Sequence, residues 1–233
     1  MVTNHQLFYT AKTGSYKMIL ISFNVNGLRA AIASGLVEFF DKLQADIILL
    51  QETKVDVPVD LSPLKYQSVW HFSKRKGYSG TVVLFKNKPI DIQYGFNNNV
   101  EINDEGRIIT LEYPLFFIVN VYVPNSQGTL DRWYYRLDWD TALYRHLSDL
   151  CARKPVIIGG DFNIAHNYID IYPENTKNIQ NRAGFREEER CGFDNLLELG
   201  FIDTFRFMHS HECGSYTWWS EKNENRKYNR GRR

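Results

Sequence analysis

The stretch KPVIIGGDFNIAH, residues 154–166, is the most informative for the fold. Residues 156–158 form a continuous β-branched run, which is typical of a strand buried on both faces. Asp161 and Asn163 follow two glycines, and residues two apart in an extended chain point to the same side. We therefore expect a buried strand that delivers a carboxylate and an amide to one site.

Strand-like and helical patterns alternate along the rest of the chain. Helical spacing covers 28–43, with a break near Gly35, and it recurs at 130–150 and 187–199. The further predicted strands are 18–23, 46–50, 81–85, 108–113, 116–123, 202–205 and 216–219. The long irregular stretch 165–185 has the length of a functional loop. This alternation predicts an α/β layered fold with a site at strand ends.

Composition narrows the class of protein. The 233 residues carry a net charge of +1, so any affinity for nucleic acid must come from a local patch. Three cysteines without C-x-x-C spacing favour a reducing, cytoplasmic compartment over a disulfide framework. No apolar run reaches membrane-spanning length. We expect a disordered extension at 1–17, followed by a single domain from 18 to 233.

Each major predicted strand ends in polar side chains: Asn24 and Asn26; Gln51 and Glu52; Asn120, Tyr122 and Asn125; Asp161 and Asn163. A single such residue more often caps a turn, but four such ends together predict a site. Hard oxygen ligands without a thiolate pattern suit Mg²⁺, with Mn²⁺ as a substitute. The residues alone thus predict a metal-assisted phosphoesterase in which an acid orients or deprotonates the attacking water.

Seven strings, in order along the chain, resemble the exonuclease III/AP endonuclease family. They are SFNVNGLRA (22–30), LQETK (50–54), GYSGTVVLF (77–85), EGRIITLEY (105–113), NVYVPNS (120–126), GGDFNIAH (159–166) and NRAGFREEER (181–190). The resemblance implies a four-layered sandwich, with two packed mixed β-sheets flanked by helices. It also implies Mg²⁺-dependent hydrolysis of DNA phosphodiesters, by incision 5′ to abasic sites and by 3′→5′ exonuclease activity. The implied partner is double-stranded DNA with abasic sites or 3′ ends, bound by a monomer without a membrane.

The same resemblance implies roles for individual residues. Glu52 is the implied metal ligand, and Asn24, Asp161 and Asn163 complete the candidate metal set. Asp161 activates or positions the water, Asn163 holds the scissile phosphate, and Tyr122 contacts that phosphate; Asn24 stands beside the metal in the catalytic set. The residues implied at the DNA surface are Arg29, Lys54, Tyr78, Arg107, Asn125 and Trp218.

Two histidine patterns have simpler interpretations. HSHEC (209–213) lacks partners at zinc-site spacing and is expected to be a loop. His166 is close to Asp161 in sequence but is expected to be structural.

The family's motif order continues, after the equivalent of Arg233, with Ile-Asp-Tyr-Phe and then Ser-Asp-His. The resemblance therefore implies an incomplete domain without its last strands, and we expect weak activity and stability. Two alternatives remain at this stage: a phosphoesterase acting on RNA or a phosphoinositide, and an inactive DNA-binding remnant.

Overall fold

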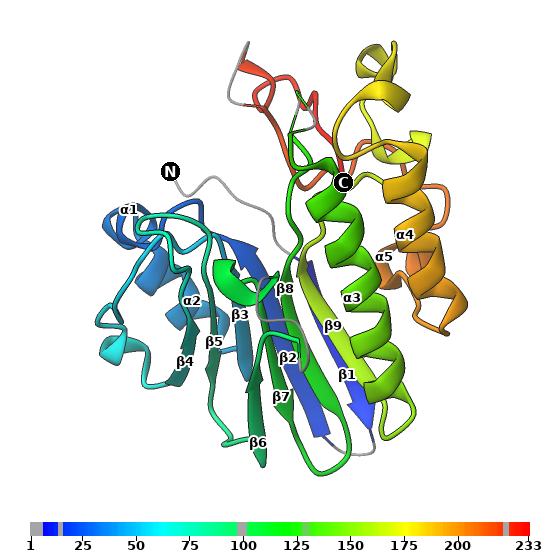
Figure 1. Ribbon diagram of the computed structural model, residues 1–233. Helices are drawn as coiled ribbons and strands as arrows, with labels where there is room; N and C mark the ends of the chain where they lie inside the picture. Colours follow the sequence, from blue (N-terminus) through cyan, green and yellow to red (C-terminus); the bar gives the residue numbers. More distant parts are fainter. Residues whose placement is uncertain (1–6, 14–15, 97–101, 128, 130, 221–223) are drawn as a thin grey trace. The chain divides into compact units, whose positions relative to one another are not determined.

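The computed structural model describes residues 7–13, 16–96, 102–127, 129, 131–220 and 224–233 (Figure 1). The chain forms two compact units, which are described separately below. The first comprises Met1–Val123 with Asp149–Phe162, and the second comprises Pro124–Ser148 with Asn163–Arg233. A single domain from 18 to 233 stays a prediction.

The first unit contains two mixed β-sheets. The five-stranded sheet has the order β1-β2-β3-β5-β4, and the four-stranded sheet has the order β6-β7-β8-β9. Only β2–β3 and β8–β9 pair in parallel among these neighbours. The strands are β1 (Leu7–Thr13), β2 (Tyr16–Asn24), β3 (Ile47–Gln51), β4 (Gln67–His71), β5 (Thr81–Phe85), β6 (Asp91–Tyr94), β7 (Ile108–Glu112), β8 (Phe117–Tyr122) and β9 (Val156–Asp161).

The apolar runs explain how the layers form. Every residue of β3 is buried, because its two faces pack against different layers. Ile48 and Leu50 pack with α1 (Leu28–Ala33) and α2 (Leu36–Leu43), whereas Leu49 packs against residues of the four-stranded sheet. Figure 1 shows α1 and α2 beside the five-stranded sheet. Two packed mixed sheets with flanking helices confirm the predicted fold class.

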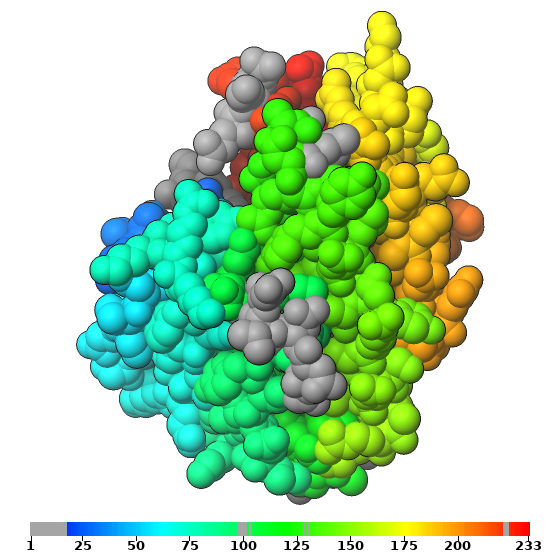
Figure 2. Space-filling view, in the orientation of Figure 1, coloured from blue at the N-terminus to red at the C-terminus, as the bar shows by residue number. Residues whose placement is uncertain are grey.

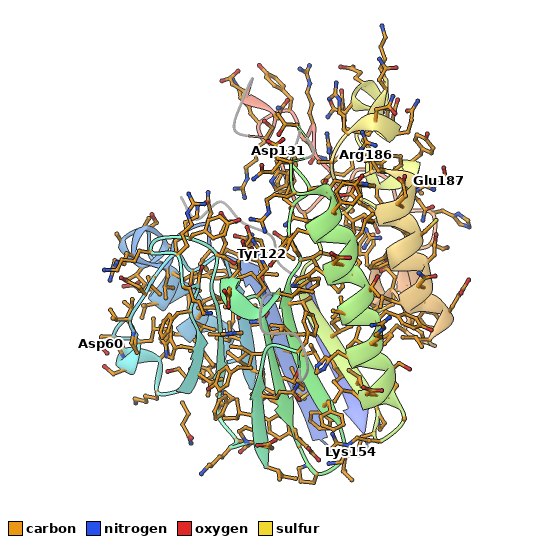
Figure 3. All side chains as sticks on the ribbon, in the orientation of Figure 1. Asp60, Tyr122, Asp131, Lys154, Arg186 and Glu187 are labelled. Carbon is orange, nitrogen blue, oxygen red and sulfur yellow. The ribbon has the colours of Figure 1, made fainter. Side chains whose placement is uncertain are left out.

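Both parallel pairs end at polar residues. Asn24 is opposite Gln51 in the β2–β3 register, and Tyr122 is opposite Asp161 in the β8–β9 register. Figure 3 shows Tyr122 at one end of the strands and Lys154 at the opposite end. Parallel strands place their carboxyl ends at one edge of a sheet, which is where α/β folds hold their sites.

The two glycines of β9 allow close packing. A Cβ atom on Gly159 would lie 2.8 Å from Cδ1 of Leu49, between the sheets. A Cβ atom on Gly160 would lie 1.9 Å from the carbonyl oxygen of Val121. Side chains at these positions would push β9 away from its neighbours, and Asp161 would move with it.

A buried amide network joins the two sheets beneath this edge. Nε2 of Gln51 donates to Oδ1 of Asn120 at 2.8 Å and to Oγ of Ser22 at 3.1 Å. Nδ2 of Asn120 donates to the carbonyl oxygens of Leu50 and Val82, at 3.1 and 3.0 Å. All three side chains are buried and bonded, as buried polar groups require.

The second unit is built from helices and short turns. It holds α4 (Glu187–Glu198), α5 (Thr204–Met208) and most of α3 (Trp133–Cys151), and side chains of α3 and α4 adjoin on the face in Figure 2. The short 3-10 turns are η3 (Tyr168–Asp170), η4 (Pro173–Asn175) and η5 (Ile179–Asn181) here, and η1 (Ser62–Leu64) and η2 (Ile102–Glu105) in the first unit.

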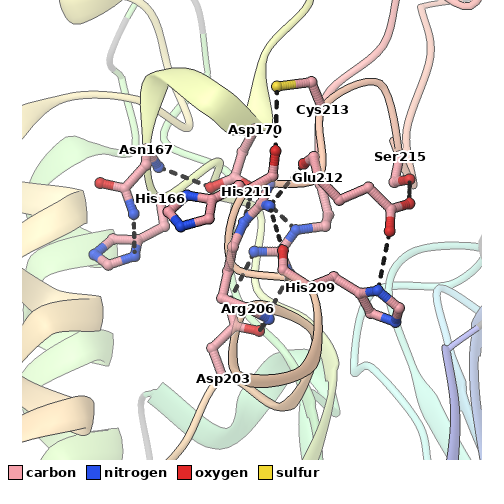
Figure 4. A network of polar contacts seen from close by, with 11 residues as sticks. His166, Asn167, Asp170, Asp203, Arg206, His209, His211, Glu212, Cys213 and Ser215 are labelled. Atoms are coloured by element: carbon pink, nitrogen blue, oxygen red, sulfur yellow. Dashed lines mark hydrogen bonds and ion pairs between the residues drawn. The ribbon is translucent and has the colours of Figure 1, made fainter.

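Asp170 is the centre of an ion-pair network in the second unit (Figure 4). It is fully buried and accepts hydrogen bonds from Arg206 and from Nε of Arg233, the latter at 3.0 Å. Nη2 of Arg233 also donates to Asp203 at 2.8 Å. Two guanidinium groups thus compensate one buried carboxylate, which ties residue 233 to the η3 turn.

Several predicted elements differ from the structure. Within 1–17, where disorder is predicted, residues Leu7–Thr13 form β1 and pair with β2; residues 1–6 and 14–15 lie outside the described residues. The predicted strand 202–205 is wrong, because Asp203 caps the helix α5 by accepting from the backbone N–H of Arg206. The predicted strand 216–219 is reduced to an isolated bridge between Trp218 and Arg232.

The short strands β4 and β6 were not predicted, because their residues are only partly buried and show little apolar patterning. The three cysteines are free and exposed. Among the described residues, no helix is both long and apolar enough to cross a membrane.

Candidate functional site

Asn24 joins two carboxylates at the strand ends of the first unit. Its Nδ2 donates to Oε2 of Glu52 at 3.0 Å and to Oδ2 of Asp161 at 2.7 Å. Its Oδ1 accepts from the backbone N–H of Asn26 at 2.9 Å, which fixes the amide orientation. Residues separated by 137 positions in sequence therefore meet through one amide. Three of the residues predicted for the site lie together.

The backbone that carries Glu52 is strained. Glu52 and Lys54 have φ angles of 56° and 53°, in the left-handed region that residues other than glycine rarely adopt. Backbone bonds hold this turn from both sides: Thr53 N–H donates to Gly80 O at 3.1 Å, and Gly27 N–H donates to Glu52 O at 2.8 Å. Strain of about 1–3 kcal/mol per residue persists only where the surroundings impose it, and it clusters at functional sites.

Tyr122 contacts the same carboxylates from β8. Its hydroxyl hydrogen-bonds Glu52. Burial, and then the negative charges of Glu52 and Asp161, raise the pKa of the Tyr122 phenol well above its ordinary value. The phenol therefore keeps its proton and acts as a hydrogen-bond donor.

Arg107 packs against the ring of Tyr122. Its guanidinium stands 4.4 Å from the centre of the Tyr122 ring and 5.7 Å from that of Tyr78. Its three nitrogen atoms donate to Glu105 Oε2 at 2.6 Å, the Tyr122 carbonyl oxygen at 3.0 Å and the Tyr78 hydroxyl at 3.2 Å. Arg107 is only 3% exposed. Arg107 is among the residues expected at the DNA surface, and its side chain is buried among protein partners in this structure.

The other residues expected at the DNA surface in this unit are accessible. Arg29 is exposed on α1, and Tyr78 is half-buried with the Arg75 guanidinium 4.8 Å from its ring centre. Nζ of Lys54 pairs with Oε1 of Glu52 at 2.9 Å and donates to Oδ1 of Asn26 at 2.6 Å. Lys54 thus offsets part of the negative charge that Glu52 brings.

Three candidate residues belong to the second unit. Nδ2 of Asn125 donates to Oδ1 of Asn163 at 3.0 Å, and Asn163 has a φ of 48°. Trp218 is 48% exposed, and the guanidinium of Arg232 stands 5.6 Å from its ring centre. The structure thus brings Asn125 and Asn163 together.

The donor set in the first unit suits a hard divalent cation. Glu52 and Asp161 both turn carboxylate oxygens toward the Asn24 amide. Mg²⁺ is commonly held by one or two carboxylates and keeps several waters. Among the described His, Cys, Asp and Glu residues, no group of three could hold a metal ion, so a site here would rely on these two acids. Asn24 is a donor in this structure; ligation through its oxygen would require the amide to turn.

The two histidine patterns have local partners. Nε2 of His166 lies 2.6 Å from Oδ1 of Asp194 on α4, and its Nδ1 faces the Asn167 side chain at 2.9 Å. Nδ1 of His209 lies 3.0 Å from Oε2 of Glu212, in the loop after α5 (Figure 4). Both contacts lie within the second unit and hold loops in place.

The second unit also has a cavity of about 600 Å³ between α3 and α4. Asp140, Glu187 and Cys191 are among its lining residues. Asp140 already pairs with Nε of Arg136 at 2.7 Å, and acids at the start of α4 stabilise the helix dipole. No predicted site residue lines this cavity.

Gln51 and Asn120 were among the polar strand ends predicted for a site, but the bond between them was not predicted. Glu105 was not among the candidate residues. Glu105 stands two residues before Arg107, and Asn120 stands two residues before Tyr122 on the same strand. Alternation along β8 gave a usable signal for Asn120, since residues two apart share a face. No pattern in the sequence indicated the partners of Glu105.

Comparisons with known proteins agree with this geometry. The profile of the Endonuclease/Exonuclease/phosphatase family matches residues 21–233. The chain is 46% identical over 206 residues to the exodeoxyribonuclease of Bacillus subtilis, covering 87% of this chain and 80% of that protein. It is 41% identical over 221 residues to the DNA repair nuclease APEX1 of Danio rerio, covering 91% of this chain and 69% of that protein.

A solved AP endonuclease from Archaeoglobus fulgidus superimposes with a TM-score of 0.81 at 28% identity, covering 92% of this chain and 83% of that chain. The matched residues include every strand end that carries the Asn24, Glu52, Tyr122 and Asp161 cluster. The chain belongs to the Endonuclease/Exonuclease/phosphatase family and, within it, to the group of exodeoxyribonucleases and AP endonucleases.

Proposed function

We propose that this chain is a Mg²⁺-dependent DNA-repair phosphodiesterase. It would incise double-stranded DNA 5′ to abasic sites and remove nucleotides from 3′ ends. The observation that carries the proposal is the Asn24 amide, which holds the carboxylates of Glu52 and Asp161 beside the phenol of Tyr122. The relatives named exodeoxyribonuclease and DNA repair nuclease support the choice of DNA as substrate.

Each side chain has a separate role in the proposed reaction. Glu52 and Asp161 would hold the cation, with Asn24 and Asn163 as further candidate ligands. The bound cation would stabilise negative charge that develops on the phosphate oxygens. Asp161 would accept the proton of the attacking water at a carboxylate oxygen, and Tyr122 would donate its phenolic O–H to a phosphate oxygen.

The remaining candidates would position the DNA. Lys54 and Arg29 offer cationic contacts for phosphates, Tyr78 offers an aromatic contact in a groove, and Asn125 would orient Asn163. Trp218 would stack on or beside the abasic nucleotide. A monomer in a cytoplasmic compartment stays a prediction.

A cleavage assay tests the proposal. The substrate is a labelled duplex with one stable abasic-site analogue, and the control is the same duplex without it. Cleavage in Mg²⁺ but not in EDTA is expected, and Glu52→Gln should raise the Mg²⁺ concentration needed for half-maximal rate. The exposed control Glu38→Gln on α2 should behave like the wild type. Equal cleavage with and without EDTA would contradict the metal role, and no cleavage in Mg²⁺ or Mn²⁺ would contradict the proposed function.

A further inference from the structure

The Arg107 cluster explains how Tyr122 is held. Arg107 is bonded through all three guanidinium nitrogens, and each bond ends on a different residue. The side chain carries the 3% exposure of a core residue although it is always charged. Burial alone would lower the pKa of Arg107, but the charge of Glu105 and the bond to it more than reverse this effect. Removing one partner of a buried ion pair is strongly destabilising, because it leaves a buried charge without compensation.

The partners of Arg107 connect two parts of the candidate site. Tyr122 contacts Glu52 through its hydroxyl, and its backbone exchanges two bonds with Arg107: its N–H donates to Arg107 O at 2.8 Å, and its carbonyl accepts from Nη1 at 3.0 Å. The Tyr78 hydroxyl accepts from Nη2 at 3.2 Å. The guanidinium therefore contacts both tyrosines, and it is closer to the ring of Tyr122.

The loop that carries Arg107 is itself braced. A Cβ atom on Gly106 would lie 2.4 Å from the carbonyl oxygen of His71, so only glycine allows this approach. Thr81 Oγ1 donates to the carbonyl oxygen of Gly106 at 3.0 Å. The Lys74 backbone N–H donates to the carbonyl oxygen of Asp104 at 2.8 Å. The segment has little freedom to move Arg107 toward solvent.

We propose that Arg107 is a positioning residue for Tyr122, holding the phenol against Glu52 through ring and backbone contacts, and that it does not bind DNA itself. This inference rests on the proposed function, because Tyr122 has its role only in the proposed cleavage reaction. The guanidinium over the face of the Tyr122 ring attracts the ring and limits its movement, so the hydroxyl stays against Glu52. Loss of Arg107 should therefore lower the rate of cleavage through Tyr122 and leave DNA affinity nearly unchanged.

A double-mutant cycle tests the proposal. The variants are Arg107→Met, Tyr122→Phe and the double variant, with kcat and KM measured on the abasic duplex. Arg107→Met should lower kcat about tenfold or more in the wild-type background and less than about threefold in the Tyr122→Phe background. Duplex affinity in EDTA should change less than about twofold. Equal effects in both backgrounds, or a weaker affinity with a smaller salt dependence, would overturn the proposal.

Arg153→Met is the matched control. Arg153 also pairs with a glutamate, Glu112, at 2.9 Å, and its guanidinium stands 4.8 Å from the centre of the Phe117 ring. It is expected to leave kcat unchanged. If Arg107→Met does not fold, Arg107→Lys takes its place. The lysine keeps the charge but lacks the planar guanidinium that lies over the Tyr122 ring, and the variant should show the same dependence on Tyr122.

A second measurement separates failure of this inference from failure of the proposed function. If the wild type does not cleave, the free energies of unfolding of Arg107→Met, Tyr122→Leu and the double variant still report the coupling. Non-additive losses would support the contact, and additive losses would overturn it.

Discussion

Loss of the Asn24 amide should lower the rate of DNA cleavage, and the Asn24→Ala variant tests this prediction. The substitution removes the donor to Glu52 at 3.0 Å and to Asp161 at 2.7 Å. A hydrogen bond to a charged group contributes about 1.5–3 kcal/mol, so the two bonds together contribute about 3–6 kcal/mol. Water that enters the gap replaces part of this interaction, so the transition state for cleavage should lose about 3 kcal/mol of stabilisation. Since each 1.36 kcal/mol corresponds to about a factor of ten, kcat should fall about 100-fold.

The assay is single-turnover cleavage of the abasic duplex in saturating Mg²⁺, with circular dichroism to confirm folding. Asn87→Ala is the control, because Asn87 is an exposed asparagine whose known bond is accepted by its backbone carbonyl. Asn24→Asp is a useful companion, since it keeps the shape but adds a third negative charge beside two others. A rate for Asn24→Ala within about threefold of wild type would refute the reasoning, because the carboxylates would then need no bridging amide.

Two further predictions concern stability. Asp170→Asn should cost about 3–5 kcal/mol in urea unfolding followed by fluorescence, because it leaves Arg206 and Arg233 without their fully buried carboxylate; a loss below about 1 kcal/mol would contradict this. Burial lowers the pKa of His71 despite its bond to the Ile108 carbonyl, so the neutral form is favoured in the folded chain. Neutral His71 contributes fully to stability above the pKa of an unfolded histidine, near 6.5, and this contribution declines as the pH falls below that pKa. The free energy of unfolding should therefore drop less between pH 7 and 5 in His71→Asn than in wild type. An identical drop in both proteins would show that His71 is not the titrating group.

The central sheet was predictable because local pattern and tertiary environment agree there. The residues of β3 are apolar without interruption, and the structure buries all five of them. Asp161 follows two glycines, and a Cβ atom on Gly160 would lie 1.9 Å from the Val121 carbonyl oxygen, so the structure explains why this position has no side chain. The break near Gly35 separates α1 from α2, as the helical spacing predicted.

What the sequence did not predict depends partly on partners that are distant in sequence and, at one place, on a local helix cap. The resemblance implied Arg107 at the DNA surface, and its burial among Glu105, Tyr78 and Tyr122 could not be predicted from the sequence. The orientation of the Asn24 amide depends on Asp161, which no local rule could supply. At 202–205 a strand was predicted, but Asp203 caps the helix α5 by accepting from the backbone N–H of Arg206.

The buried Gln51–Asn120 hydrogen bond affects the alignment of the two sheets more than the free energy of unfolding, so selection for stability need not preserve activity. Hydrophobic contacts between two sheets tolerate small sliding motions, but bonds with fixed direction admit one alignment only. Asn120 reaches the backbones of β3 and β5 at Leu50 and Val82, immediately below the strand end that carries Glu52. Replacing the whole amide network by apolar residues of similar volume could preserve the free energy of unfolding. A library of such variants ranked by thermal stability would therefore retain proteins in which Glu52 and Tyr122 no longer face each other, and only a screen for catalysis would discard them.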